Sequence, residues 1–269
     1  MENFLFEVLP MSLSIPSNNL SQRYLKPLLE GDRAQCRKVI EEALFEGATA
    51  HELITQLLWP TMETIQTHHR EDRINQNTLN LATRLNRAIT DQVSTRLEKK
   101  PANDRRVLIF CGADEPEELG GQITADLFES DGWTTRFAGG GVPDDEVLNF
   151  IGEYRPHLLV MFGTLPSGVP AVRKLIDYLR EVNSCPDMQV MCCGGIYKRA
   201  EGLSEEIGAD LYAPDGAEAV KVASANPNRR ATVDQQTVGR TRRIRKAAAR
   251  KAAGANRHLV KTQSGDENE

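Results

Sequence analysis

Residues 105–121 read RRVLIFCGADEPEELGG, and this stretch decides the fold. Its apolar run 107–111 is short, follows two arginines and ends at Gly112, which is the pattern of a strand buried on both faces. The segment 117–130 that follows has the apolar spacing of a helix. The stretch therefore predicts a strand, a glycine-containing turn and a helix in direct succession.

The same succession recurs as far as residue 223. Apolar runs lie at 107–111, 133–138, 157–162, 188–193 and 210–213, and helical patterns at 117–130, 143–154, 171–182, 198–207 and 216–223. Strands that alternate with helices form a parallel sheet covered on both faces, and this length favours a flavodoxin-like five-stranded α/β fold. A ligand is then expected at the carboxyl ends of the strands, in the loops 112–121, 138–142, 163–168 and 194–197.

From residue 20 to residue 100 the apolar period changes to three and four, which predicts an all-α cap bundle of four helices. Gly31 separates the first two helices, and Thr49 is expected to cap the third. Pro60 lies inside the third helical pattern and should kink it. Trp59 lies on the apolar stripe of that helix, so we expect it in the core.

The 269 residues thus divide into a flexible N-terminus (1–19), the cap (20–100), a linker (101–104), the α/β domain (105–223) and a tail (226–269). The sequence has neither a basic leader nor an apolar run of about 18 residues, so we expect no membrane contact and a cytoplasmic location. The five cysteines show no CxxC spacing, which favours reduced and buried thiols.

The net charge of −5 conceals a division along the chain. Residues 1–228 hold 34 acids and 22 bases, whereas residues 229–261 hold eleven bases and one acid. The basic segment has no apolar stripe, so it favours phosphate contacts with nucleic acid over membrane insertion. Contact with the acidic body and a solvated tail are the alternatives. The candidate contact residues are Arg240, Arg242, Arg243, Arg245, Lys246, Arg250 and Lys251.

The loops exclude two other functions that this fold can carry. The loop after the first strand lacks GxGxxG, so the fingerprint of a dinucleotide site is absent. A phospho-receiver domain needs an aspartate at the end of the third strand, where residues 161–164 read MFGT. The loop glycines carry no function by themselves, because each can serve as a turn residue.

The order and spacing of the loops resemble the cobalamin-binding module of methionine synthase, corrinoid methyl carriers and light- or cobalamin-sensing regulators. That family carries the motifs DxHxxG, SxL and GG. In this chain the second motif follows the first after 42 residues, and the third follows after 28 more. The upstream helices resemble the cap of the same family. The matching positions are Glu115, Glu117, Gly120, Gly163, Thr164, Leu165, Gly194 and Gly195.

The resemblance implies cobalamin as cofactor and gives these positions their roles. In the family the His is the lower cobalt ligand, the Asp and Ser orient that imidazole, and the small residues leave a slot for the nucleotide tail. Here Glu117 replaces the His, Glu115 the Asp and Gly163 the Ser, with Thr164 adjoining. Because a carboxylate is a harder and weaker partner for cobalt than an imidazole, we expect no lower ligation of the family's kind.

The resemblance also extends to the upper face of the corrin. Sensor relatives place a Trp there, followed by a Glu-His pair, and the aligned positions here are His69, Leu79 and Asn80. His69 and Glu117 are therefore the candidate metal ligands, with His69 able to bind cobalt or a haem iron from above. The alternative for His69 is a solvated residue at a charged helix end.

We therefore predict a non-enzymatic regulatory or sensory module that binds a corrinoid or another tetrapyrrole and signals by docking a protein partner. One alternative is a ligand-free scaffold that binds protein or nucleic acid. The other is a corrinoid methyl carrier serving a methyltransferase, which the loss of the lower His disfavours. The sequence leaves the formation of a homo-oligomer open.

Overall fold

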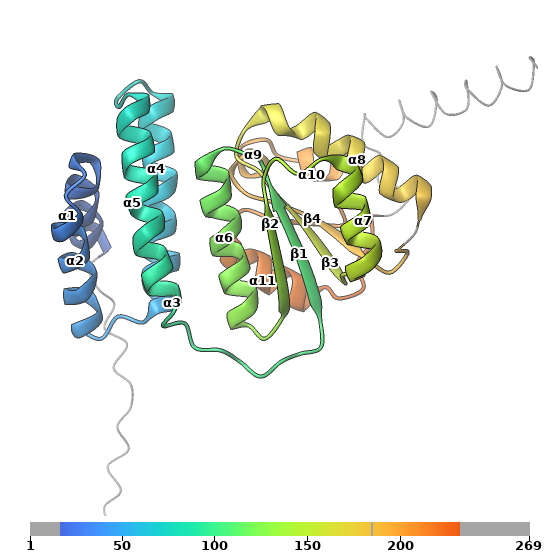
Figure 1. Ribbon diagram of the computed structural model, residues 1–269, viewed down its shortest axis with the longest axis horizontal. Helices are drawn as coiled ribbons and strands as arrows, with labels where there is room; N and C mark the ends of the chain where they lie inside the picture. Colours follow the sequence, from blue (N-terminus) through green and yellow to red (C-terminus); the bar gives the residue numbers. More distant parts are fainter. Residues whose placement is uncertain (1–16, 184, 232–269) are drawn as a thin grey trace, which may run out of the picture.

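The computed structural model describes residues 17–183 and 185–231 (Figure 1). A helical part runs from Ser17 to Ser94 and an α/β part from Arg106 to Ala225. The contact residues predicted in the basic tail lie outside the described residues, as does most of the N-terminus expected to be flexible. The first helix begins at Ser17, inside that N-terminal segment.

Four helical segments make up the cap within the described residues, as the apolar spacing predicts. Asp32 caps the second by accepting a hydrogen bond from Gln35 N, and Thr49 forms a capping box with Glu52 at the start of the third. The segments are α1 (Ser17–Glu30), α2 (Arg33–Phe45), the continuous run of α3 (Ala50–Glu52), η1 (Leu53–Leu58) and α4 (Trp59–Arg70), and α5 (Gln76–Ser94).

The irregularity predicted at Pro60 takes the form of a π-helical segment, η1, directly before it. Trp59 N donates to Ile54 O, a hydrogen bond that spans five residues. Proline has no N–H to donate and its ring crowds the turn before it, so a wider turn accommodates it within one helix. The helix continues beyond Pro60 and ends at Arg70.

The described residues contain one five-stranded parallel sheet in the order β2-β1-β3-β4-β5. This is the flavodoxin-like order, so the predicted fold class is confirmed. The strands are β1 (Arg106–Cys111), β2 (Thr134–Gly139), β3 (Leu158–Phe162), β4 (Gln189–Cys193) and β5 (Leu211–Ala213). The connecting helices are α6 (Glu115–Ser130), α7 (Asp144–Tyr154), α8 (Val169–Val182) after the short η2 (Pro166–Gly168), α9 (Gly195–Arg199), α10 (Leu203–Glu206) and α11 (Gly216–Ala225).

Alternate residues of the strands pack on opposite faces of the sheet. One core contains Val107, Ile109 and Val160 with residues of α6 and α11, and the other contains Leu108 and Leu159 with residues of α7 and α8. Figure 1 shows α6 and α11 on one side of the strands and α7 and α8 on the other. Both faces are therefore covered, as the continuous apolar runs require.

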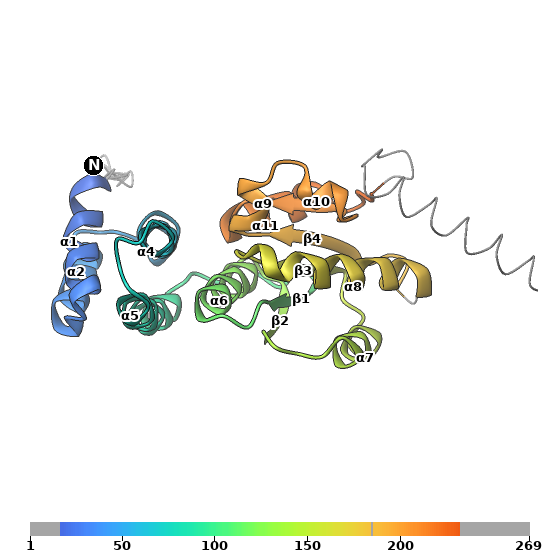
Figure 2. The same ribbon diagram turned by 90° about the horizontal axis from the view of Figure 1, so that it is seen from above.

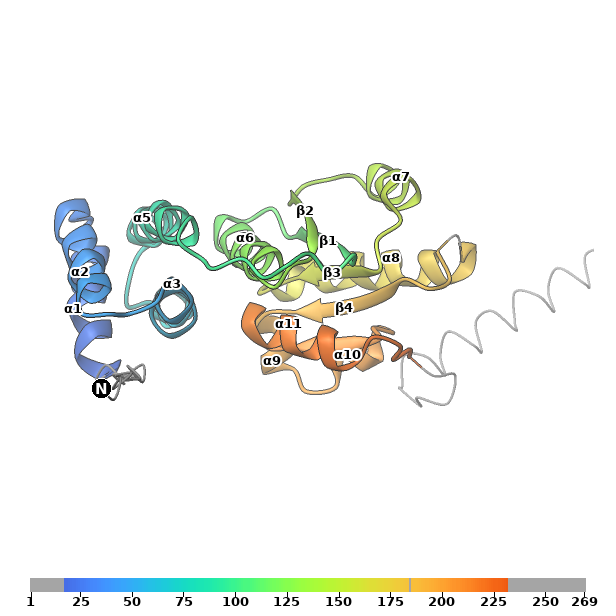
Figure 3. The ribbon, with the colours of Figure 1, turned by 90° about the horizontal axis from the view of Figure 1, so that it is seen from below.

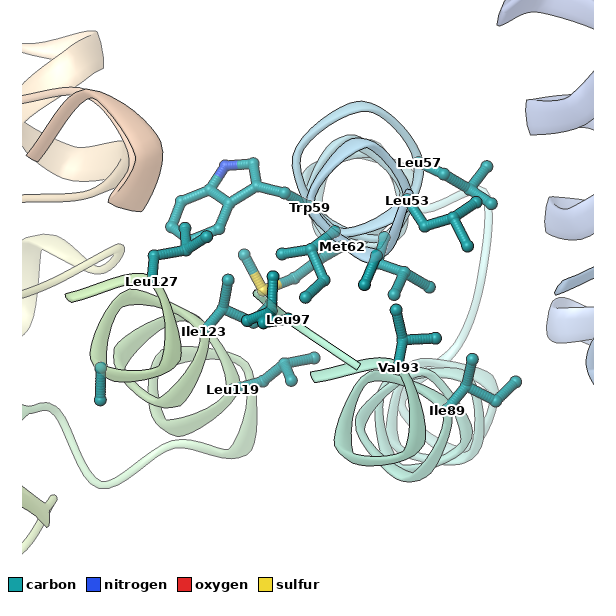
Figure 4. Packing of buried hydrophobic residues seen from close by; sticks show 14 of the residues in the cluster. Leu53, Leu57, Trp59, Met62, Ile89, Val93, Leu97, Leu119, Ile123 and Leu127 are labelled. Carbon is teal, nitrogen blue, oxygen red and sulfur yellow. The ribbon is translucent and has the colours of Figure 1, made fainter. Parts of the chain in front are cut away.

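The cap packs on α6, so this helix has cap residues on one side and the sheet on the other (Figure 2). In Figure 4, Met62 of α4 and Val93 of α5 face Leu119 and Ile123 of α6. The linker between α5 and β1 passes the end of α6 (Figure 3), where Lys100 N donates to Ser130 O at 2.8 Å. One continuous hydrophobic core consequently includes both the cap and one face of the sheet.

Two sequence expectations about local structure were wrong. The segment 198–207 is not one helix, because Gly202 adopts a left-handed conformation (φ +77°) and separates α9 from α10. The strand expected at 157–162 begins at Leu158, and His157 before it is exposed, with Nδ1 accepting a hydrogen bond from Arg106 N at 2.9 Å. Among the described residues, none of the helices is both long enough and apolar enough to cross a membrane.

Candidate functional site

The loops after β1, β3 and β4 meet at the carboxyl edge of the sheet because these three strands are neighbours. The structure therefore brings together the predicted positions of all three motifs. Glu115 is the first residue of α6, and its side chain lies outside the described part of the chain. Glu117 and Gly120 follow in the first turns of α6, where they face the loop after β3.

Glu117 fastens the first loop to the second. Its side chain is only 4% exposed, and Oε1 accepts hydrogen bonds from Thr164 N at 2.5 Å, Leu165 N at 2.9 Å and Thr164 Oγ1 at 3.2 Å. Three donors on one carboxylate oxygen compensate the burial of its charge. We call this arrangement the Glu117 latch.

The other carboxylate oxygen of Glu117 lies against Gly112, the residue that follows β1. A Cβ added at Gly112 would stand 1.6 Å from Glu117 Oε2, so position 112 admits no side chain while the latch is closed. The glycine in the turn after β1 is thus explained by a close approach of Glu117 to the backbone. Oε1 is consequently engaged by hydrogen bonds, and Oε2 lies packed close to the backbone at Gly112.

Phe162, the last residue of β3, occupies the space beside the motif glycines. A Cβ added at Gly120 would stand 2.2 Å from the Phe162 ring, and one at Gly194 would stand 3.0 Å from it. Trp59 of the cap meets the same ring edge-on, with the centroids 5.8 Å apart. Both aromatic residues are buried, and Trp59 belongs to the core as predicted. Phe162 therefore fills the space beside Gly120, whereas Gly194 is required first by its positive φ (+107°) and by Gly163 O, 2.6 Å from its would-be Cβ.

The other two motif glycines are less constrained. A Cβ added at Gly163 would make ordinary contacts, the nearest at 3.5 Å to Ile196. One at Gly195 would meet the flexible end of Arg199 at 2.9 Å. These two positions do not require glycine for the same reason as Gly120 and Gly194.

A cleft of about 190 Å³ lies between α4 and α9, above the latch. Its walls come from both parts of the chain, and Thr164 is the latch residue that reaches it. His68 and His69 are not among the described residues that line it. The lining residues are Trp59, Met62, Glu63, Gln66, Thr67, Arg70, Phe162, Thr164, Gly195, Lys198 and Arg199.

Charged residues join the two walls of the cleft. Lys198 of α9 pairs with Glu63 of α4 at 3.2 Å, and Arg199 donates to the carbonyl oxygen of Thr164. Burial lowers the pKa of Arg199, and the positive charge of Arg70 lowers it further. The cleft is therefore electropositive, with Glu63 as the one acidic residue among its described lining.

The thiols next to the motif glycines are core residues. Cys192 and Cys193 are fully buried, and burial raises the pKa of Cys192 to about 12, so the thiol stays protonated. Among the described residues, no cluster of three or more His, Cys, Asp or Glu side chains could hold a metal ion. Neither Glu117 nor His69 is part of such a cluster.

Comparison with known proteins gives this geometry its context. Residues 20–93 match the family model described as "B12 binding domain". The α/β fold that follows the matched helices also occurs, in the same order along the chain, in a structure of the Methanosarcina barkeri monomethylamine corrinoid protein. That structure superposes with a TM-score of 0.68 at 20% identity and covers 77% of this chain and 98% of its own.

The chain therefore resembles the cobalamin-binding module family, whose model matches its helical part. Two curated relatives are corrinoid proteins of Methanosarcina species. Monomethylamine corrinoid protein 1 of Methanosarcina mazei is 23% identical over 198 residues, which are 71% of this chain and 90% of that protein. Its namesake from Methanosarcina acetivorans is 22% identical over 196 residues, 71% of this chain and 89% of the relative. The resemblance supports a corrinoid as the ligand class of this architecture and gives no support to haem.

The residues present at the matching positions of this chain do not fit a corrinoid held from below. The position that the resemblance gives to the lower ligand holds a carboxylate whose Oε1 is engaged by Thr164 and Leu165 and whose Oε2 packs close to Gly112. Phe162 fills the space beside the motif glycines. The cleft of about 190 Å³ is also smaller than the roughly 300–1,000 Å³ of pockets for drug-sized ligands, which a corrinoid exceeds in size.

Sequence reasoning missed Gly112, Phe162 and the three cations of the cleft. The signal for Phe162 was present in the sequence, because a bulky aromatic residue directly precedes Gly163 of the second motif. Arg70, Lys198 and Arg199 gave no signal, because the spacing within one helix does not reveal which side chains of another helix it faces. The described chain beyond α11 is also anchored: Gln189 Nε2 donates to Arg229 O at 2.7 Å and Ala231 N donates to Asp210 at 2.7 Å.

Proposed function

We propose that this protein is a non-catalytic regulatory module that keeps the cobalamin-binding architecture but does not use a corrinoid. In this proposal the Glu117 latch takes the place of the cofactor in joining the loops at the carboxyl edge of the sheet. The cap and the α/β part form one recognition unit for a protein partner. A corrinoid-dependent sensor or methyl carrier would require the Glu117 latch, that is, the hydrogen bonds of Glu117 to Thr164 and Leu165, to break.

The engagement of Glu117 is the observation that carries the proposal. Binding a corrinoid from below would require Glu117 to leave Thr164 N, a buried donor, and Leu165 N, a part-buried one. Leaving such groups unpaired costs about 1–3 kcal/mol each. Phe162 would also have to leave Gly120 and Gly194. Both costs oppose insertion of a nucleotide tail.

Retention of hydroxocobalamin after desalting tests the proposal. The purified protein, a double variant Glu117→His with Gly163→Ser and a control variant Glu129→His are mixed with the corrinoid, and their visible spectra are compared. The double variant restores both polar positions of the family's lower face, and the contacts at Gly163 leave room for a serine. The control adds a histidine at an exposed position of the same helix.

We expect no retained corrinoid in the natural sequence or in the control. The double variant should also stay colourless, because Phe162 still fills the space beside Gly120. Among these variants, we expect only the triple variant, with Phe162→Ala added to the double variant, to retain hydroxocobalamin after desalting. Stoichiometric retention by the natural sequence would overturn the proposal, and retention by the double variant would show that the slot is open.

Binding to nucleic acid through the basic tail is the second candidate function. It is supported by the charge of residues 229–261, which hold eleven bases against one acid. The tail follows the anchored residues Arg229 and Ala231 at the amino end of β4, opposite the latch. In this proposal the tail and the cleft would act at separate ends of the α/β part.

A further inference from the structure

The cleft between α4 and α9 carries a pattern of charges and donors that the Glu117 latch does not use. Three cations line it: Arg70 comes from the cap, and Lys198 and Arg199 come from the α/β part. Glu63 is the one carboxylate of the described lining, and it pairs with Lys198. Glu63 also attracts Arg199, so the three cations share a single carboxylate among the described lining and leave an excess of positive charge in the cleft.

The two arginines are close enough to influence each other. The charge of Arg70 lowers the pKa of Arg199, in addition to the larger effect of burial. Arg199 is fixed by its hydrogen bond to Thr164 O, and Arg70 by a 2.8 Å bond to Thr67 Oγ1. Their charges thus converge from the two walls of the cleft, and an anion between them would relieve the repulsion.

Uncharged donors in the same cleft also lack acceptors. Trp59 Nε1 and Gln66 Nε2 are buried nitrogen atoms without a hydrogen-bond partner in the described structure. Trp59 is 6% exposed, and both residues line the cleft. A buried donor without an acceptor is unfavourable, so an acceptor bound in the cleft would stabilise these groups if it reached them.

The size and walls of the cleft define its occupant. The cleft has a volume of about 190 Å³, and Trp59, Met62 and Phe162 supply an apolar wall. We propose that the cleft binds a small organic anion, with one carboxylate or phosphate head held by Arg70 and Arg199 and a compact, flat apolar body against Trp59. The proposal rests on the proposed function in requiring that no corrinoid occupy this space.

Such a ligand would act on the junction between the cap and the α/β part. Its head would compete with Glu63 for Lys198, whose 3.2 Å ion pair joins α4 to α9. The same two residues and Trp59 also line a second cavity, of about 310 Å³, on the other side of this ion pair. Opening the pair would join the two cavities, so occupancy of the cleft would be coupled to the packing of the cap.

Tryptophan fluorescence can measure binding at this cleft directly. The chain has two tryptophans, and Trp133→Phe leaves Trp59 as the sole indole, so its emission reports on the cleft. The probes are benzoate and phenyl phosphate, with benzyl alcohol as the neutral analogue and inorganic phosphate as the head alone. Titration of the full chain with each probe at fixed ionic strength separates the contribution of the charge from that of the ring.

We expect saturable quenching by benzoate or phenyl phosphate, and weaker or no binding of benzyl alcohol and of inorganic phosphate. Arg70→Gln and Arg199→Gln should each raise the dissociation constant at least about tenfold, since a hydrogen bond to a charged group contributes about 1.5–3 kcal/mol. Arg33→Gln, at an exposed arginine of α2, should leave it unchanged. Arg199→Lys keeps the positive charge but lacks the paired N–H donors of the guanidinium group, so it should bind with intermediate affinity. This variant also keeps the proposal testable if Arg199→Gln does not fold.

Two results would overturn the inference: no saturable change with either aromatic anion, or equal affinities in the Arg70, Arg199 and Arg33 variants. Binding of inorganic phosphate as tight as that of phenyl phosphate would overturn the assignment of an apolar body. These outcomes are distinguishable from failure of the proposed function. Absence of anion binding in a protein that also retains no hydroxocobalamin leaves the proposed function standing, whereas retained corrinoid contradicts both.

Discussion

The carboxylate of Glu117 stands 1.6 Å from the point that a Cβ on Gly112 would occupy. The turn after β1 and the first turn of α6 are therefore matched to each other. We expect Gly112→Ala to lower the free energy of unfolding by about 1–3 kcal/mol through overpacking. The same substitution in a Glu117→Ala background should cost much less, giving a coupling energy of about 1 kcal/mol or more in urea denaturation. Additive effects of the two substitutions would contradict the close approach.

The hydrogen bonds of the Glu117 latch can be weighed by two substitutions of the same residue. Glu117→Gln keeps an acceptor for Thr164 N and Leu165 N but loses the charge, so we expect a loss of about 1 kcal/mol of unfolding free energy. Glu117→Ala leaves both backbone donors unpaired and should cost about 2–4 kcal/mol. Equal losses in the two variants would show that the hydrogen bonds do not stabilise the loop.

Asp126 on α6 makes the stability depend on pH. Burial is the main cause that raises the pKa of this carboxyl to about 6, and Asp91 and Glu129 raise it further. Because the folded pKa lies above the unfolded value, the folded state disfavours ionisation. The unfolding free energy therefore falls as the pH rises from about 4 to about 6, and the penalty is complete above that range.

Asp126→Asn should remove this penalty. We expect the variant to gain about 1–2 kcal/mol over the natural sequence at pH 8, a figure that allows for partial solvent screening, and to gain nothing at pH 4. Urea denaturation at the two pH values measures the difference. Asp187→Asn, at an exposed position, is the matched control and should behave alike at both. A gain of the same size at pH 4 would rule out the ionisation of Asp126 as its cause.

Salt-sensitive retention of DNA tests the basic tail. A full-length variant with Gln at Arg242, Arg243, Arg245 and Lys246 should bind DNA less tightly, and its affinity should depend less steeply on salt concentration. A shortened chain should end at Ala231 instead of before Arg229, because Gln189 and Asp210 bind the backbone of residues 226–231. Fluorescence anisotropy with labelled duplex DNA provides the measurement. Unchanged affinity and salt dependence in both proteins would exclude the tail as a nucleic-acid contact.

The fold could be predicted from the sequence because its pattern is local. Apolar runs such as 107–111 and the helical period of residues 20–100 specify the elements, and their alternation specifies the parallel sheet. The exceptions follow from single residues that take an uncommon backbone conformation. Gly202, for example, divides a predicted helix into α9 and α10 through its left-handed φ.

The position of the site could be predicted from the sequence, but the contacts that its side chains make could not. Motif spacing placed Glu117, Thr164 and Gly194 at one edge of the sheet, yet it could not show that the Glu117 carboxylate bonds to the loop backbone. The cleft depends on how α4 lies across α9, and this follows from packing between residues more than a hundred positions apart. Side chains such as Arg70 and Arg199 become neighbours through that packing alone.

Helix α6 belongs to two layers at once, with Leu119 and Ile123 facing the cap and Phe128 in the core with the sheet. A break in the linker 101–104 would therefore remove the covalent connection while leaving the apolar surfaces complementary. Two fragments, ending and beginning at such a break, should recombine when expressed together, and each should be poorly soluble alone. The protein is consequently suited to fragment complementation, in which recovery of the assembled fold reports that two fused partners have met.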